Sequence, residues 1–481
     1  MSGYRFAAPC QPDPGDEHDH LAGLLPAGML PPARRARPPG DDPAACAVLA
    51  WARSGLMHLT GQACGPPLAP RAPVMARAAV IAAAITELTG RQGDRVRLGL
   101  DHVLAFRASQ TGWARRGTVS LNGTCRILRA ADGWVAVNLA RPDDLRSVPA
   151  VLGRNLPDSG ATVWEELQAE AAARPAAELA AAAQAVGIPA AALRARALRP
   201  APALPPAEFP APVTATRLGP AGTAPRLVLD LSAMWAGPLS ASILGRAGWR
   251  VLKVEDVHRP DGARSGPPAF YADLHAGSRT VILDFGSAQG RAELSRLAGQ
   301  AGVVVESSRP RALRRLGLVA EDWLRASPGR VWVSVTGYGR RDPQQRVAFG
   351  DDAAVAGGLV AWAADGTPLF CGDAIADPLS GLHAALSALA AHAAGGGWLV
   401  DVAMAGVCAD LARPTAAPAW PHVISPARAR GADRGAVVGA TDRAQGAAMA
   451  GGEAGAGGEA RAAGAGWKVR HGEVTEPVRS W

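Results

Sequence analysis

Short apolar runs alternate with longer, partly apolar segments between residues 225 and 410. Five runs are rich in valine and leucine, as the buried strands of a parallel sheet are; they span 226–231, 250–255, 280–284, 302–306 and 330–335. The intervening segments predict helices; one ends at 246, and the others span 288–298 and 321–326. This alternation predicts an α/β fold with a Rossmann-like, doubly wound parallel sheet.

The pattern differs between residues 46 and 200, where short strands and alanine-rich helices mix. Helices are predicted over 76–88 and 164–186, and strands over 93–100 and 134–138. The second of these strands follows Asp132-Gly133, a dipeptide that is typical of hairpin turns. We therefore expect a smaller α+β part here.

Proline-rich and low-complexity stretches separate and flank the two blocks. Apolar residues make up 48% of the chain and charged residues 19%, which excludes a wholly disordered protein. The proline and alanine content of 201–224 is typical of a semi-rigid linker. We expect five segments: a disordered leader (1–45), a first block (46–200), the linker (201–224), a second block (225–410) and a low-complexity tail (411–481).

The formal charge of +8 rests on 48 arginines and two lysines. With the abundant alanine, glycine and proline, this is typical of a GC-rich genome. Nucleic-acid binding would require this charge to cluster on one face, so the charge alone does not predict a nucleic-acid partner. The six cysteines form no C-x-x-C pair, so neither a disulfide framework nor a metal site is predicted. No signal peptide or membrane-spanning run is visible, and we expect a soluble, cytoplasmic protein without a membrane partner.

A stretch of about fifty residues occurs twice. Each copy has a loop, an alanine-rich helix, a glycine turn and a short strand. Gly55 corresponds to Gly358, and Val96 corresponds to Val400, with offsets of 303 and 304 residues. One copy lies early in the first block and the other closes the second block, so we predict an internal repeat.

Ordered motifs in the second block resemble family III CoA-transferases, the formyl-CoA and carnitine CoA-transferase group. The motifs run over about 180 residues, at 230–238, 251–255, 277–284, 303–310 with 316–318, 333–339, and 375–377 with 380–382. The first block resembles the later half of the same family, at Ser54, 94–100, 132–137, Trp164 and 187–190. The family's two halves thus occur in inverted order.

The inverted order leaves two arrangements open. The halves form a complete active site within one chain, or they assemble between chains. Subunits of the family interlock as linked rings in dimers, so the resemblance implies a homodimer.

The resemblance implies that Asp377, in Ile375-Ala-Asp377, is the catalytic nucleophile. A carboxylate there attacks an acyl-CoA thioester, and CoA then passes through an aspartyl thioester to an acceptor acid. The residue type and position also fit a capping role, because Asp377 precedes a proline at the predicted start of a helix. In the first copy of the repeat, no aspartate occurs between Asp42 and Asp94, so only the second block can supply the nucleophile.

Asp352 matches a second carboxylate of the family, for which a supporting role in positioning or acid/base chemistry is implied. The alternative role for Asp351 and Asp352 is to cap the start of a helix before Ala353. The related α-methylacyl-CoA racemases have a histidine at the position of Asp351. This chain has no histidine there, which disfavours a racemase.

Coenzyme A, as the acyl-CoA substrate, is the cofactor that the resemblance implies, and no metal is implied. The absence of a G-x-G-x-x-G motif argues against NAD. The residues that match the family's contacts to the nucleotide are Trp235, Ala236, Leu283, Asp284, Phe285, Ser307, Ser308, Arg309 and Arg315. Each arginine taken alone is typical of a solvated surface.

The expected function is therefore transfer of CoA between an acyl-CoA thioester and a carboxylic acid through an aspartyl intermediate. The acyl donor and acceptor have no signature among these motifs. Two alternatives stay open. One is an isomerase like α-methylacyl-CoA racemase, and the other is a non-catalytic, degenerate half-copy that acts as a binding subunit.

Overall fold

The computed structural model describes residues 43–156, 162–193 and 210–413. Most of the predicted leader (1–45), the first part of the predicted linker and nearly all of the predicted tail (411–481) lie outside the described residues. Within the described ranges no helix has the length and apolar character that crossing a membrane requires.

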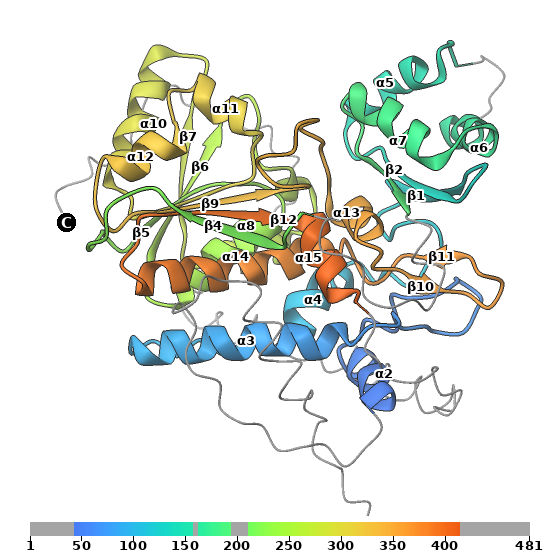
Figure 1. Ribbon diagram of the computed structural model, residues 1–481, viewed down its shortest axis with the longest axis horizontal. Helices are drawn as coiled ribbons and strands as arrows, with labels where there is room; N and C mark the ends of the chain where they lie inside the picture. The colour runs from blue at the N-terminus through green and yellow to red at the C-terminus, as the bar shows by residue number, and fades with distance from the viewer. Residues whose placement is uncertain (1–42, 157–161, 194–209, 414–481) are drawn as a thin grey trace, which may run out of the picture. The chain divides into compact units, whose positions relative to one another are not determined.

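A twisted sheet forms the centre of the second block, as the alternating pattern predicts (Figure 1). The described residues give it seven strands in the order β4-β12-β9-β8-β5-β6-β7, and all neighbours are parallel except β4 and β12. The strands are β4 (Val213–Arg217), β5 (Leu227–Leu231), β6 (Arg250–Asp256), β7 (Arg279–Leu283), β8 (Val303–Glu306), β9 (Val331–Thr336) and β12 (Trp398–Ala403). The α/β, Rossmann-like fold class is confirmed.

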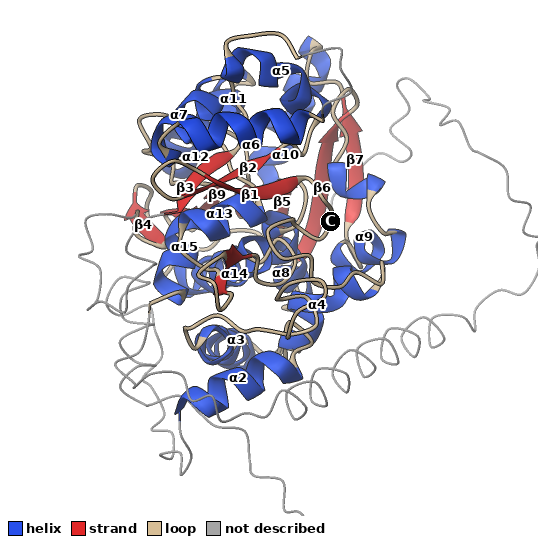
Figure 2. Cartoon of the chain, turned by 90° about the vertical axis from the view of Figure 1, so that its right-hand side faces the viewer, coloured by secondary structure: helices blue, strands red, loops and turns tan. Residues whose placement is uncertain are grey.

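Helices cover both faces of this sheet (Figures 1 and 2). One face packs against α8 (Ala236–Arg246) and α14 (Ala376–Ala393), and the other against α10 (Ala288–Gln300) and α12 (Ala320–Arg325). The remaining helices of this block are α9 (Pro268–Leu274), α11 (Pro310–Arg315), α13 (Gly350–Ala356) and α15 (Met404–Leu411). A short hairpin, β10 (Ala361–Trp362) with β11 (Pro368–Leu369), lies between α13 and α14 in sequence.

The strand β4 lies inside the stretch that the sequence predicts to be a linker (201–224). It pairs antiparallel with β12, from Val213 opposite Val402 to Arg217 opposite Trp398. Of its five residues only Val213 is buried, as fits a strand at the edge of the sheet, where one side of a strand needs no partner.

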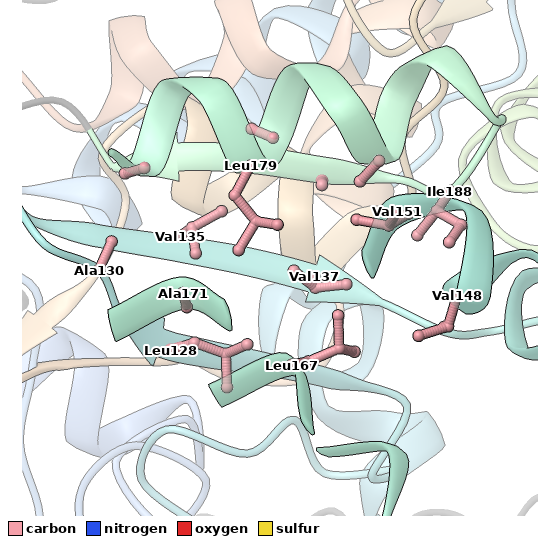
Figure 3. Close-up of a cluster of buried hydrophobic side chains, with 14 of the residues drawn as sticks. Leu128, Ala130, Val135, Val137, Val148, Val151, Leu167, Ala171, Leu179 and Ile188 are labelled. Atoms are coloured by element: carbon pink, nitrogen blue, oxygen red, sulfur yellow. The ribbon is translucent and has the colours of Figure 1, made fainter. Parts of the chain in front are cut away.

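The first block holds a smaller α+β part. The described residues there form a three-stranded antiparallel sheet of β1 (Cys125–Arg129), β2 (Trp134–Asn138) and β3 (Ala190–Leu193). Three helices cover it: α5 (Pro142–Leu152), α6 (Val163–Ala173) and α7 (Ala176–Ala185). In Figure 3, Leu167 of α6 and Leu179 of α7 point towards Val135 and Val137 of β2, and all four side chains are buried.

Two predictions for the first block are wrong. The helix predicted over 164–186 is two helices, because Pro175 interrupts the helical hydrogen bonding between α6 and α7. The strand predicted over 93–100 does not form. The backbone of Val96 instead bonds the hydroxyls of Thr86 and Thr89, so it has no strand partner.

Among the described residues, three helices precede the small sheet: α2 (Pro43–Arg53), α3 (Val74–Arg91) and α4 (Leu100–Ser109). Helix α3 packs against α14, and Figures 1 and 2 both place the two side by side. Both helices have 18 residues, and α4 follows α3 as α15 follows α14. Gly55 and Gly358 both have positive φ, 82° and 77°. These features support the internal repeat, which stays a prediction.

Candidate active site

Four aspartates gather where α13 and α14 begin. Asp351 and Asp352 lie in the first turn of α13, Asp373 lies in the loop before α14, and Asp377 is the second residue of α14. Asp352, Asp373 and Asp351 are 0%, 1% and 6% exposed, whereas Asp377 is half-buried. Among these four carboxylates, Asp377 is therefore the one that a substrate can reach most easily.

Gly350 allows the two helix starts to approach closely. Its N–H faces the Asp377 carboxylate and lowers the pKa of that group. A Cβ at position 350 would lie 2.6 Å from Asp377 Oδ2 and 2.3 Å from the carbonyl oxygen of Ala374. No other residue type fits without displacing the backbone at Ala374, so Gly350 keeps Asp377 beside α13.

The first block supplies a cation to this cluster. Arg107, in α4, binds Asp373 through two parallel hydrogen bonds, Nε to Oδ2 at 2.7 Å and Nη2 to Oδ1 at 2.5 Å. Its side chain is 12% exposed and that of Asp373 is 2% exposed. The pair is bidentate and mostly desolvated, which is a strong arrangement for an ion pair.

Burial raises the pKa of Asp377 to about 7; Arg107 opposes this rise, and Asp352 and Asp373 add to it. Burial also raises the pKa of Asp351 to about 7, with further increases from Asp373 and Asp377 and an opposing effect of Arg107. One cation faces several carboxylates, so the cluster holds protons up to neutral pH.

Asp352 is part of the hydrogen bonding that begins α13. Its Oδ1 accepts bonds from the Phe349 N–H at 3.0 Å and from Asn138 Nδ2 at 2.9 Å. Burial is the main cause that raises the pKa of Asp352 to about 7. Asn138 ends β2, so this contact joins the small sheet to the cluster.

The backbone is strained next to two candidate site residues. Among the described residues that are not glycine, Met234, Gln345 and Ala374 have positive φ; the values are 72°, 48° and 42°. Met234 precedes Trp235, and Ala374 lies three residues before Asp377. Such conformations cost about 1–3 kcal/mol each and persist where surrounding contacts enforce them. Here the Ala374 N–H donates to Asp351 Oδ1 at 3.1 Å.

The predicted nucleotide contacts follow the carboxyl ends of parallel strands. The strand order reverses between β5 and β8, and ligands of open α/β sheets bind in the crevice at such a point. The segment 232–235 follows β5, and Ser307 follows β8; the Ala233 N–H donates to Ser307 Oγ at 3.2 Å. Leu283 ends β7, two strands further along this edge.

A buried charge network supports the turn after β5. Lys253, on β6, is fully buried, and its Nζ lies 3.0 Å from Asp261 and 3.5 Å from Asp230. Burial alone would lower the pKa of Lys253, but the neighbouring carboxylates outweigh it and the pKa is raised. Asp261 Oδ1 also accepts the Met234 N–H at 2.9 Å, which links the network to the strained turn.

A cavity of about 580 Å³ lies between α5 and α7 of the first block and the start of α11. Arg141, Arg309 and Arg311 line it together with Gln184 and the 343–345 loop. Burial lowers the pKa of Arg309, and repulsion from Arg311, Arg141 and Arg259 lowers it further. Asp143 and Asp144 also line the cavity, and Asp144 pairs with Arg141 at 2.6 Å. The excess positive charge is therefore that of Arg309 and Arg311, whose repulsion an anion would relieve.

Comparison with known proteins identifies the family. A family model described as CoA-transferase family III matches residues 36–198 and 225–445, which is most of the chain. The chain belongs to CoA-transferase family III. The second block and all but the last two residues of the first block lie within the matched ranges, and the whole predicted linker (201–224) lies between them.

Curated relatives of this CoA-transferase family III chain match over part of their length. An acyl-CoA transferase from Fusarium pseudograminearum is 33% identical over 37% of this chain and 44% of the relative. A succinyl-CoA–D-citramalate CoA-transferase from Chloroflexus aurantiacus is 30% identical over 36% and 47%. A succinate–glutarate CoA-transferase from Agrobacterium fabrum is 31% identical over 37% and 50%. The chain thus spans about half the length of the curated relatives that it matches.

Solved structures of similar proteins cover a comparable share. A CaiB/BaiF family protein from Brucella suis is 26% identical over 40% of this chain and 55% of its own, with a TM-score of 0.35. A hypothetical protein from Mycobacterium tuberculosis is 29% identical over 40% and 57%, with a TM-score of 0.36.

The predicted site residues of this family III chain fall into two groups. Asp377 and Asp352 lie together at the starts of α14 and α13. Trp235 and Ala236 begin α8 and are buried, while Ser308 and Arg309 are half-buried after β8. Leu283, Asp284 and Phe285 are half-buried at the end of β7, Ser307 is exposed after β8, and Arg315 is exposed at the end of α11.

Three residues of the cluster have no signal in the sequence motifs. Arg107 is one of many arginines and is separated from Asp373 by 266 positions. Asn138 lies 214 positions before Asp352. Asp373 lies just before the nucleophile motif. In the described part of the chain, no group of three or more His, Cys, Asp or Glu side chains is arranged to hold a metal ion.

Replacement of Asp351 by asparagine is expected to stabilise the protein at alkaline pH. The pKa of Asp351 in the folded protein is about 7, above the ordinary value of 3.8. The contribution of the Asp351 carboxyl group to folding stability is therefore fully present below about pH 4 and is lost as the pH rises through 7. The asparagine side chain would stay neutral and keep an oxygen for the Ala374 N–H. Urea denaturation should give a gain of roughly 2 kcal/mol near pH 8 and a smaller gain near pH 5. An equal change at both pH values would contradict this prediction.

Proposed function

We propose that this protein transfers CoA between an acyl-CoA thioester and a carboxylic acid, with Asp377 as the nucleophile. The observation that carries the proposal is the exposure of Asp377. It is half-buried, whereas Asp351, Asp352 and Asp373 are enclosed. The membership of CoA-transferase family III supports the reaction type. Relatives named as transferases acting on succinyl-CoA support dicarboxylic acids as candidate substrates.

The reaction begins when the Asp377 carboxylate attacks the thioester carbonyl. The C–S bond breaks, the CoA thiolate leaves, and a mixed anhydride forms between Asp377 and the acyl group. The thiolate then attacks the Asp377 carbonyl, which releases the donor carboxylate and leaves CoA on Asp377. The acceptor carboxylate repeats these steps in reverse, so one thioester replaces another and the net free-energy change is small.

The pKa of Asp377 sets the pH at which this chemistry operates. The attacking species is the carboxylate, and burial raises the pKa of Asp377 to about 7. Partial desolvation of the carboxylate also strengthens its interaction with the Gly350 N–H. Asp352 has a supporting role, because it fixes the start of α13 from which Gly350 reaches Asp377.

CoA binds along the carboxyl edge of the sheet. The adenine and phosphates contact Trp235, Ala236, 283–285, Ser307, Ser308, Arg309 and Arg315. The crowded arginines of the 580 Å³ cavity support an anionic ligand there, and Arg309 lines that cavity. The resemblance to the family supports the remaining contacts.

Replacement of Arg309 by alanine is expected to raise KM for acyl-CoA about tenfold, since a hydrogen bond to a charged group contributes about 1.5–3 kcal/mol. The turnover number kcat should change little, because Arg309 lies away from the carboxylate cluster in this account. The matched control is Arg325→Ala, an exposed arginine that pairs with Asp322 on α12. Steady-state kinetics that leave KM unchanged would remove Arg309 from the CoA site.

The arrangement within the chain follows from the same proposal. The first block (46–200) corresponds to the family's later half and the second (225–410) to its nucleotide-binding half, and together they build one active site in one chain. The contacts of Arg107 with Asp373 and of Asn138 with Asp352 support this arrangement. We further propose a cytoplasmic homodimer, which the resemblance to interlocked family dimers supports.

The test combines a transfer assay with a proton-exchange assay. The protein is incubated with succinyl-CoA and a panel of carboxylic acids, and CoA thioesters are separated by chromatography. New thioesters, with no solvent deuterium in the recovered donor, support the transferase. Deuterium at Cα of a 2-methylacyl-CoA without transfer would favour the isomerase instead. A lack of CoA binding would refute both and leave a binding subunit.

A further inference from the structure

We propose that Arg107, which the first block supplies, positions the loop that precedes the nucleophile and provides the positive charge that faces Asp377. The inference rests on the proposed role of Asp377. Arg107 acts through Asp373 and through the electrostatic field at Asp377, so it is a positioning residue.

The loop 372–374 is held from the first block at two points. Arg107 binds both oxygens of Asp373, and the Gly372 N–H donates to Thr60 Oγ1 at 3.1 Å. The Thr60 hydroxyl itself donates to the Leu56 carbonyl at 2.8 Å, so its orientation is fixed. Residues that lie about 270 to 310 positions earlier in the sequence thus anchor the segment before α14.

This anchoring explains how the strained conformation at Ala374 persists. With a φ of 42°, Ala374 lies in the left-handed region, which costs an alanine about 1–2 kcal/mol. The Arg107–Asp373 pair fixes the residue before it, and Asp351 accepts its N–H. Without Arg107, we expect Ala374 to relax towards negative φ and to move the first turn of α14.

Arg107 also determines the charge around the nucleophile. Asp377 is surrounded by Asp351 and Asp352 of α13, by Asp373 of the loop, and by the thiol of Cys408 on α15. In the described part of the chain, Arg107 is the cation that lowers the pKa of Asp377 against these neighbours. Its loss would therefore leave Asp377 protonated to a higher pH.

The same guanidinium reaches the turn that is proposed to bind CoA. It lies 5.0 Å from the ring centroid of Trp235 and 5.6 Å from that of Trp113. Trp235 in turn packs edge-on against Phe270, at 4.9 Å between centroids. Arg107 thus connects the loop 372–374 with the start of α8. Asp373 in that loop and Trp235 beside α8 are 138 positions apart in the sequence.

The test measures kcat/KM against pH for the full-length protein and for Arg107→Gln and Arg107→Lys. In Arg107→Gln, the acid limb of the profile should move up by about one pH unit, since an opposite charge nearby shifts a carboxyl pKa by about 1–3 units. Arg107→Lys keeps the charge but loses the two-pronged contact. It should keep the position of the acid limb while kcat falls about tenfold or more, because a misplaced nucleophile costs rate. The control is Arg116→Gln, which removes an exposed arginine that bonds the Leu121 carbonyl within the first block.

A uniform loss of activity at every pH in Arg107→Gln, with the acid limb unmoved, would overturn the inference and leave Arg107 as a purely structural residue. A second readout does not depend on turnover. The pH midpoint at which a carbodiimide modifies Asp377, followed by peptide mass analysis, should rise in Arg107→Gln and stay in place in Arg107→Lys. An unmoved midpoint refutes the inference. If the midpoint rises in Arg107→Gln but the wild-type protein shows no transfer activity, the proposed function alone is refuted.

Discussion

The variant Asp377→Asn is expected to lose CoA transfer by at least about 10³-fold, because an amide cannot attack a thioester and the reaction then has no covalent route. The size and shape of the side chain are kept, so substrate binding should change little. The measurement is the rate of formation of new CoA thioester, followed by chromatography. Asp377→Ala should give a loss of similar size.

The structural alternative for Asp377 predicts a different outcome. An acidic residue in the first turn of a helix stabilises the helix by about 0.3–1 kcal/mol. If that were its role, Asp377→Asn would lower stability slightly and leave turnover intact. We expect the reverse, since burial raises the pKa of Asp377 and neutralisation removes a desolvation cost at pH 8. Asp322→Asn, in the exposed first turn of α12, is the matched control and should leave transfer unchanged.

The variant Lys253→Met is expected to destabilise the protein by about 3–5 kcal/mol, because removal of one member of a buried ion network leaves charges without compensation. Lys253 is fully buried between Asp230 and Asp261, and its removal leaves both carboxylates enclosed. Urea denaturation near pH 7 measures the loss. The variant that remains folded should also bind CoA more weakly. Lys253 pairs with Asp261, and Asp261 accepts the Met234 N–H in the turn that is proposed to bind the nucleotide.

Neutralisation of the two carboxylates separates the charge effect from packing. The triple variant Lys253→Met, Asp230→Asn, Asp261→Asn removes the uncompensated charges and should recover part of the lost stability. The same loss in the single and triple variants would indicate that the packing of the Lys253 side chain, and not its charge, stabilises this region.

Much of the second block could be predicted from its sequence because its strands are buried on both faces. The runs 226–231, 302–306 and 330–335 consist mainly of apolar residues, and they form β5, β8 and β9 to within one residue at each end. A local pattern suffices there, since each strand is identified by its own residues. The parallel pairing of these strands also follows from the alternation of strands and helices.

The sequence was less informative where structure depends on a distant partner. The strand β4 forms within the proline-rich 201–224 because β12 offers it an edge, and β12 lies some 185 residues later. The segment 94–99 has a strand-like alternation but meets threonine hydroxyls of α3 in place of another strand. A local pattern carries no information about such partners.

The candidate site divides in the same way. Asp377 and Asp352 were accessible through ordered motifs that lie close together in the chain. Arg107 could not be found in this way, because nothing in the neighbouring sequence distinguishes it from other arginines. Its proposed role depends on the packing of α4 beside the 372–374 loop. The structure thus adds the contribution of the first block to a site that the sequence placed in the second block alone.

The central claim is that CoA becomes covalently attached to Asp377. The most direct measurement is incubation with an acyl-CoA in the absence of acceptor, followed by hydroxylamine and peptide mass analysis. Hydroxylamine attacks the aspartyl thioester carbonyl and displaces the CoA thiol, so the account predicts a hydroxamate on the peptide that contains Asp377 and none in Asp377→Asn. Transfer of CoA to an added acid, with no modification of that peptide at any time, would contradict the account.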